Sequence, residues 1–199
     1  GIGAAELIKI ISGSIASKLI VPVPSFNEYA NAAPEGAVVE FALDHPSFQL
    51  DMDKFAAEAL RCKADVAVVV SPNNPTSMLV PKADLIRLAT KLAQHECMLI
   101  VDESFIDFAT NRDQQTLEKD LALYPNLTIL KSMSKAYGIC GLRIGYMLTA
   151  NTDFAEKVRA GIHIWNLNSF AETFLEMVPG YLEDFELSCA EVRKDRDQF

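Results

Sequence analysis

Lys135 is the residue whose neighbours most clearly indicate chemistry. It lies in the segment KSMSKAYG, with Ser132 and Ser134 before it and Arg143 eight residues after it. Serine hydroxyls and a forked, charged guanidinium suit a phosphate dianion, and the intervening glycines let the backbone approach closely. A lysine beside such a phosphate-binding segment can form an imine with a carbonyl group. Taken alone, the segment also fits a solvated lysine in a polar loop.

The same segment contains a competing motif. Ser132 to Lys135 spell the S-x-x-K of the serine β-lactam hydrolases. Those enzymes also need an S-D-N and a K-T-G element, and the sequence contains neither. This interpretation is therefore set aside.

Three more residues stand where predicted strands end or have just ended. Asp102 ends an apolar run, and a buried carboxylate there is costly unless it meets a positive group. Asn74 lies in the turn SPNNPT and Phe26 follows Pro-Ser. Each also has an ordinary interpretation, because Asp102 fits a helix cap or surface acid, Asn74 a turn residue and Phe26 a core aromatic.

Composition narrows the class of protein. Half of the 199 residues are apolar, enough for a core, and the net charge is −9. That charge argues against nucleic acid or an anionic membrane as partner, and no apolar run approaches the ~18 residues needed to span a bilayer. The four cysteines and three histidines are scattered, so we expect no metal site, no disulfides and a cytoplasmic location.

Strands and helices are predicted to alternate, which is the pattern of an α/β fold with a mainly parallel sheet. The expected strands are 19–23, 37–42, 64–70, 97–101, 127–130 and 144–148. The expected helices are 4–18, 26–33, 52–62, 82–95, 152–160 and most of 168–198. Ligands bind beyond the carboxyl ends of the strands in such sheets. The polar clusters at 71–74, 102–103 and 132–135 all fall there.

In this order the segments resemble a known family. SPNNPT, VDESF and KSMSKAYGICGLRIGY look like the class I and II aminotransferases, which depend on pyridoxal 5′-phosphate. The resemblance is to the branch that holds histidinol-phosphate aminotransferases and threonine-phosphate decarboxylases. GIGAAELI resembles that branch's G-N-G-x-x-E-L-I. The stretch IWNLNSFA resembles threonine-phosphate decarboxylases and domains fused to nucleotidyltransferases.

The resemblance implies a role for each residue of the site. Lys135 would be the Schiff-base lysine and would move the proton, while Asp102 would pair with the pyridine nitrogen. Asn74 would bond the ring oxygen, Phe26 would stack on the ring, and Phe105 would lie beside them. The phosphate would be held by the remaining predicted residues, which are Gly1, Ile2, Gly3, Ser132, Ser134 and Arg143.

The sequence departs from the family pattern in three places. Ile2 replaces the usual asparagine, which removes one phosphate contact. Phe105 replaces a tyrosine that donates to the ring oxygen in many members, although decarboxylase-like members also carry phenylalanine. The small C-terminal domain and the N-terminal arm of the family are missing. We therefore expect 1–199 to be a truncated large domain, with 160–199 as a helical connection towards the small domain.

The fold implied is a three-layer α/β/α arrangement around a mixed, mainly parallel, seven-stranded sheet. The leading function is amino-group transfer between an amino acid, including phosphorylated ones, and a 2-oxo acid, in a homodimer. Decarboxylation of a phosphorylated amino acid is the alternative, since it uses the same carbanion chemistry. An inactive fragment or dimerisation module is the third hypothesis.

Overall fold

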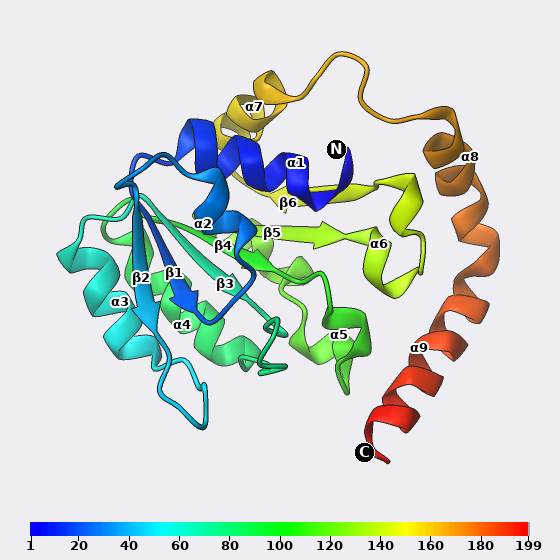
Figure 1. The fold of residues 1–199 in the computed structure, drawn as a ribbon, viewed down its shortest axis with the longest axis horizontal. Helices are drawn as coiled ribbons and strands as arrows, with labels where there is room; N and C mark the ends of the chain where they lie inside the picture. Colours follow the sequence, from blue (N-terminus) through cyan, green and yellow to red (C-terminus); the bar gives the residue numbers. More distant parts are fainter. Residues whose placement is uncertain (199) are drawn as a thin grey trace.

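The computed structural model describes residues 1–198 and builds them around one sheet of six strands (Figure 1). Phe199, the last residue of the predicted domain, lies outside the described residues. The strands follow the order β2-β1-β3-β4-β5-β6, and all neighbours are parallel except β5 and β6. Their bounds are β1 Leu19–Val23, β2 Val38–Ala42, β3 Val66–Val70, β4 Met98–Asp102, β5 Leu127–Ser132 and β6 Gly145–Thr149.

The central strands align their carboxyl ends at one edge of the sheet. Every residue of β3 is buried, as expected for a β-branched run covered on both faces. Val70 pairs with Asp102, and Asp102 pairs with Leu130, so β3, β4 and β5 end side by side. The polar segments that follow these strands are thereby brought to one place.

Two helical layers cover the sheet. On one face α3 (Met52–Arg61) and α4 (Lys82–Ala93) pack on alternate strand residues such as Val69, Leu99 and Ile129. The other face is covered by α1 (Gly3–Ile10), α2 (Glu28–Ala32) and α7 (Thr152–Gly161), which pack on the intervening strand residues. The expected three-layer α/β/α architecture is confirmed (Figure 1).

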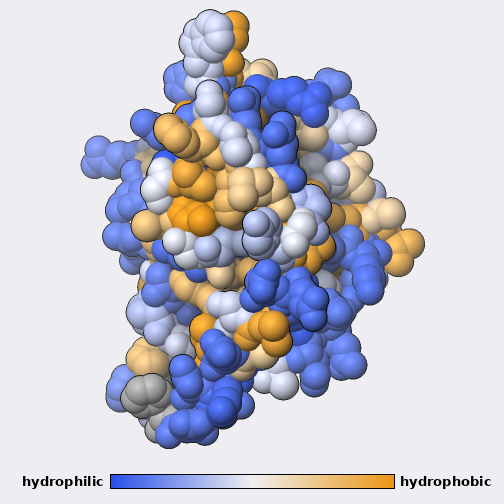
Figure 2. Space-filling view, turned by 90° about the vertical axis from the view of Figure 1, so that its right-hand side faces the viewer, coloured by the Kyte–Doolittle hydropathy of each residue, from blue (hydrophilic) through white to orange (hydrophobic). Residues whose placement is uncertain are grey.

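The last two long helices run along one side of the molecule. They are α8 (Ser169–Met177) and α9 (Leu182–Arg196). Tyr137 stacks on Phe185 of α9 with ring centroids 4.1 Å apart and meets Phe174 edge-on at 5.9 Å. On this face apolar side chains gather in a patch with polar side chains around it (Figure 2). Within residues 1–198, no helix is long and apolar enough to cross a membrane.

The structure differs from the sequence expectations in two respects. The described residues form six strands rather than seven. Outside these strands they form one isolated bridge, between Ile2 and Ile144. The region 106–123 forms short helical turns that were not predicted, because pieces this short carry no hydrophobic period. The remaining short elements are Ile11–Ile15, Ile106–Phe108, Arg112–Gln115, Glu118–Leu123, Met133–Ala136, Cys140–Leu142 and Val178–Tyr181.

Candidate active site

A cavity of about 120 Å³ lies at the aligned strand ends, and eight of the predicted site residues line it. Ala4, Ala5, Val70, Ser104 and Cys140 complete its wall. The eight predicted residues are Phe26, Asn74, Asp102, Phe105, Ser132, Ser134, Lys135 and Arg143. Residues more than a hundred positions apart in the sequence therefore meet because their strands end at one edge of the sheet.

Asp102 is the most deeply buried charged group in this wall. It is the last residue of β4 and is 3% exposed. Its Oδ2 accepts a hydrogen bond from the Tyr29 hydroxyl at 2.9 Å, and its Oδ1 accepts one from the Ser104 N–H at 2.9 Å. Burial raises the pKa of Asp102, while the bonds from Ser104 and Tyr29 act in the opposite direction. No ion pair with Asp102 is formed by residues 1–198.

Lys135 reaches the cavity from the turn that follows β5. The strand ends at Ser132, and the short helix α6 (Met133–Ala136) begins at once. The Ser132 N–H donates to the Ser104 hydroxyl at 2.9 Å, which fixes the start of this turn against β4. Lys135 is exposed, and its Nζ lies 5.7 Å from the centre of the Phe105 ring. Within residues 1–198 Lys135 forms no ion pair, and its side chain lines the cavity.

Arg143 closes the end of the cavity near the serines. Its Nη1 donates to the Cys140 carbonyl at 3.0 Å and lies 3.5 Å from the Ser134 Oγ. Its guanidinium also packs on Gly3, where an added Cβ would stand 2.7 Å from Nη2. Gly3 has a φ of +70°, a conformation that suits glycine. Gly3 is therefore needed both for its backbone and for the close approach of Arg143.

Gly1, Ile2 and Gly3 do not line this cavity, so their role at the phosphate stays a prediction. The Ile2 N–H donates to Glu6 Oε2 at 2.7 Å, and the Gly3 N–H donates to the Arg143 carbonyl at 2.9 Å. Their N–H groups are therefore already used. Ala4 and Ala5 line the cavity instead, in the first turn of α1, where N–H groups have no partner inside the helix.

Asn73 links the loop that contains Phe26 to the turn that contains Asn74. The Asn73 side chain accepts from the Ser25 hydroxyl at 2.6 Å and donates to the Pro24 carbonyl at 3.0 Å. This ties the loop after β1 to the turn after β3. Both loops contribute a residue to the cavity wall, Phe26 from the first and Asn74 from the second.

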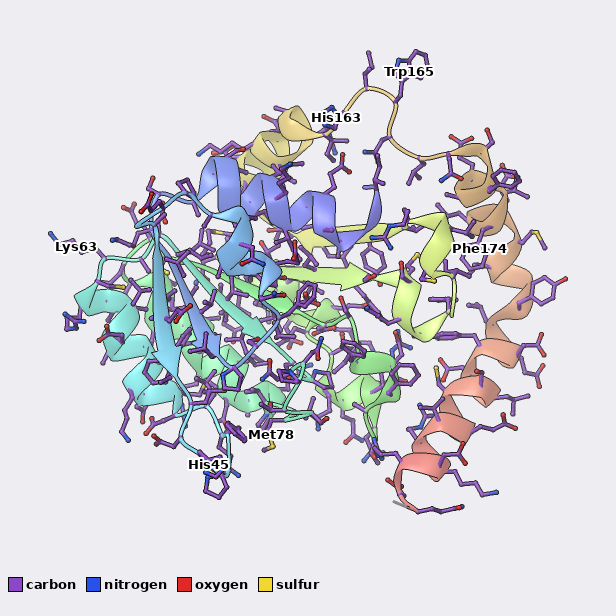
Figure 3. The ribbon with its side chains drawn as sticks, in the orientation of Figure 1. His45, Lys63, Met78, His163, Trp165 and Phe174 are labelled. Carbon is purple, nitrogen blue, oxygen red and sulfur yellow. The ribbon has the colours of Figure 1, made fainter. Side chains whose placement is uncertain are left out.

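Several contributors were missed from the sequence. Tyr29 and Asn73 act through hydrogen bonds that are visible only in the folded chain. Ser104 lies within the segment VDESF but was not among the predicted site residues. The signal for Ser104 was its place two residues after a buried aspartate, where its N–H can reach the carboxylate. The histidines do not line the cavity, and His45 and His163 lie on loops far apart (Figure 3).

Residues 2–199 match the protein family described as aminotransferase class I and II. This chain belongs to that family. The family's coenzyme is pyridoxal phosphate, and one structural neighbour, a histidinol-phosphate aminotransferase from Sinorhizobium meliloti, was solved in complex with it.

Three relatives illustrate the range of this aminotransferase family. The chain is 44% identical to CMP-5′-(3-aminopropyl)phosphonate synthase of Streptomyces rubellomurinus, over 97% of the chain and 30% of that protein. It is 32% identical to L-serine phosphate decarboxylase of Sulfurospirillum multivorans, over 98% of the chain and 50% of that protein. The histidinol-phosphate aminotransferase of Clostridium acetobutylicum superposes with a TM-score of 0.90 at 29% identity, over 100% of this chain and 58% of that one.

The residues of the cavity fit the family coenzyme. A buried carboxylate with no cationic partner among the described residues suits a protonated pyridine nitrogen. Arg143, two serine hydroxyls and the first turn of α1 form a donor set for a phosphate. The exposed Lys135 lines the same cavity and has the amine that an imine requires.

Proposed function

We propose that this chain binds pyridoxal phosphate in the cavity at the strand ends, with Lys135 as the covalent attachment point. The observation that carries this is the buried Asp102 carboxylate, which has no cationic partner in residues 1–198 and shares a cavity with an exposed lysine. Asp102 would pair with the pyridine nitrogen and keep it protonated.

The phosphate would lie at the opposite end of the cavity. Arg143 supplies the charge there, and Ser132 and Ser134 supply hydroxyl donors. Ala4 and Ala5 present the first turn of α1, where the helix dipole favours an anion. These groups would hold the coenzyme in place while its bonds to Lys135 change.

The side chains between these ends would orient the ring. Asn74 would donate its amide to the ring oxygen, and Phe26 would cover one ring face. Phe105 lies beside them and cannot donate a hydrogen bond. A second cavity of about 380 Å³ shares Asn74 and Phe105 with the first and extends to Arg196, which leaves room for a substrate next to the coenzyme.

When bound, the coenzyme supplies a protonated ring that accepts the electron pair released at the α-carbon of an amino acid. With the coenzyme bound, a substrate amine would replace Lys135, whose freed amine would then carry a proton to or from the reacting carbon. Asp102 keeps its negative charge throughout, which requires that it stay ionised at the working pH.

The substrate class that the relatives favour is an amino acid with a phosphate or phosphonate group. Decarboxylation is favoured over the amino-group transfer predicted from the sequence, for two reasons. By the family resemblance, Phe105 stands where decarboxylase-like members also carry phenylalanine. The Streptomyces relative is named for a primary amine without a carboxylate, the type of product that loss of carbon dioxide from an amino acid gives.

The proposal is tested by loading the chain with pyridoxal phosphate and adding O-phospho-L-serine or an amino acid with a phosphonate side chain. Release of carbon dioxide is the expected result. Formation of a 2-oxo acid that depends on a second 2-oxo acid would assign amino-group transfer instead. Absence of coenzyme binding would support an inactive fragment or dimerisation module. Lys135→Ala is the control for any turnover.

The chain spans 30% to 58% of the length of the three relatives described above. The activity and the partners of a whole protein are therefore proposals as well. The homodimer, the cytoplasmic location and the role of 160–199 as a connection towards a second domain stay predictions.

A further inference from the structure

Tyr29 lies beneath the candidate site without touching the cavity. It belongs to α2, three residues after Phe26, and its side chain is 1% exposed. Its ring packs in the core between α1, α2 and the sheet. Its hydroxyl donates to Asp102 Oδ2 at 2.9 Å, which is the only hydrogen bond found for this group within residues 1–198.

The chemistry of this pair fixes the direction of the hydrogen bond. Burial, together with the nearby Asp102 charge, raises the pKa of Tyr29 well above its usual value, so the phenol keeps its proton. The phenol therefore donates and the carboxylate accepts. A hydrogen bond donated to a carboxylate favours the ionised form of the acid. Ser104 holds Oδ1 in the same way, so both oxygens of Asp102 are fixed by neutral donors.

We infer that Tyr29 is a positioning residue, whose phenol holds the Asp102 carboxylate ionised and aimed at the nitrogen of the coenzyme ring. This inference rests on the proposed function. It assigns to Tyr29 a role beyond filling the core, because a phenylalanine would fill the same space without a donor.

Few other charges face Asp102. Among the described residues, Lys135 of α6 and Arg143 share its cavity, and Tyr29 of α2 is its direct partner. The neighbouring Glu103 is turned away, since its oxygens accept from the Thr116 hydroxyl and the Leu117 N–H. Within the described residues, Tyr29 and Ser104 supply the hydrogen bonds to Asp102, so loss of the Tyr29 hydroxyl removes the donor to Oδ2.

The test is the substitution Tyr29→Phe, probed with pyridoxamine 5′-phosphate, which has the coenzyme's ring and phosphate but cannot form an imine with a lysine. Binding is measured by fluorescence titration across a range of pH. We expect affinity to fall roughly ten- to a hundredfold, the factor that a hydrogen bond to a charged group contributes. The loss of affinity on acidification should also begin at a higher pH, because Asp102 now protonates more easily.

Two comparisons separate this role from simple packing. Tyr146→Phe is the control, because Tyr146 is a half-buried tyrosine that forms no hydrogen bond with Asp102 in the described part of the chain. It should leave the affinity and its pH profile unchanged. In an Asp102→Asn background, Tyr29→Phe should lose most of its effect, because the charge that it supports is gone. An equal effect in both backgrounds, or an unshifted pH profile, would overturn the inference.

Failure of this inference is distinguishable from failure of the proposed function. The carboxyl infrared band of Asp102 can be titrated in the coenzyme-free protein, with Asp102→Asn to assign it. If Tyr29→Phe does not raise that pKa, Tyr29 has no such role, whether or not the coenzyme binds. If the wild type binds no coenzyme while the pKa does rise, the proposed function fails and the hydrogen bond stands.

Discussion

Two buried aspartates of this molecule differ in whether a nearby lysine forms an ion pair with them: Asp107 pairs with Lys131, whereas Asp102 forms no pair with Lys135. Lys131 is 3% exposed, and its Nζ lies 2.8 Å from Asp107 Oδ1, while Asp107 is 2% exposed. Asp102 is buried to the same degree, yet neutral donors hold it and Lys135 makes no ion pair with it. The charge of Asp107 is balanced by cations of the chain itself, whereas Asp102 has no such cation and can accept one that a ligand brings.

The Asp107 set also joins parts of the fold. Arg112 Nε lies 2.9 Å from Asp107 Oδ1, close enough for an ion pair but without hydrogen-bond geometry. Arg193 of α9 donates to the Asp107 carbonyl at 2.9 Å. This cluster thus connects β5, the turn at 106–108 and α9. The comparison assigns structure to Lys131 and Asp107, and coenzyme binding to Lys135 and Asp102.

The largest expected effect is on the coenzyme absorption band when each of the two lysines is replaced separately. Lys135→Ala should abolish the visible absorption band of the coenzyme–lysine imine, because the amine that forms the imine is gone. Lys131→Met should keep that band in whatever fraction of the protein stays folded. Absorption spectra after addition of pyridoxal phosphate check both. A band that survives Lys135→Ala and disappears in folded Lys131→Met would reverse the assignment.

The two aspartates should differ in their contribution to stability. Asp107→Asn leaves the buried Lys131 charge without its partner, and removal of one partner of such a pair costs about 3–5 kcal/mol. Asp102→Asn removes a buried charge that has no cationic partner, so the free energy of unfolding should not fall by a comparable amount. Urea unfolding of the coenzyme-free proteins at neutral pH measures both. Equal losses in the free energy of unfolding would show that the two carboxylates contribute equally to stability, which would contradict the comparison.

The pH dependence of stability sharpens the same contrast. Burial raises the pKa of Asp102 in the folded chain. Below its unfolded pKa the carboxyl is protonated in both states and costs nothing. As the pH rises from the unfolded pKa to the folded pKa, the unfolded chain releases its proton first, so Asp102 lowers stability across that window. Relative to the wild type, Asp102→Asn should therefore gain stability with rising pH. A difference that is flat with pH would count against a raised pKa.

The smallest expected effects concern the ring oxygen. Phe105→Tyr should add a donor near that oxygen and lower the pH midpoint of the visible coenzyme band, whereas Asn74→Ala should raise it. One hydrogen bond contributes roughly 0.5–1.5 kcal/mol, which corresponds to shifts of about half to one pH unit. Spectrophotometric titration of the loaded protein measures both. If neither midpoint moves, the ring does not lie between these residues.

Most helices and strands were predictable, because the spacing of apolar residues shows which side chains are buried. The run that forms β3 and the stripe that forms α4 were both identified from their patterns, with ends within two or three residues. The order of the strands was not accessible, since pairing depends on contacts between distant segments. The seventh strand was carried over from the family resemblance, and the described residues form six.

Site residues were predictable where a polar side chain lies at or just after the carboxyl end of a predicted strand. Asp102, Ser132 and Lys135 share that feature and line one cavity. Tyr29 was not predictable, because a tyrosine on a short helix resembles any core aromatic until its hydroxyl is seen on Asp102. Asp102 was predicted from its place at the end of an apolar run, but nothing in the sequence indicated that Asp107 is buried as well. Their difference arises from Lys131 and Arg112, which fold against only one of them.

The central claim is that Lys135 carries the coenzyme. It is tested most directly by incubating the chain with pyridoxal phosphate, reducing it with borohydride and mapping the modified peptide by mass spectrometry. The account predicts a single reduced adduct on Lys135, with Lys131 unmodified in its ion pair. An adduct on Lys131 or on any other lysine, with Lys135 unmodified, would contradict it.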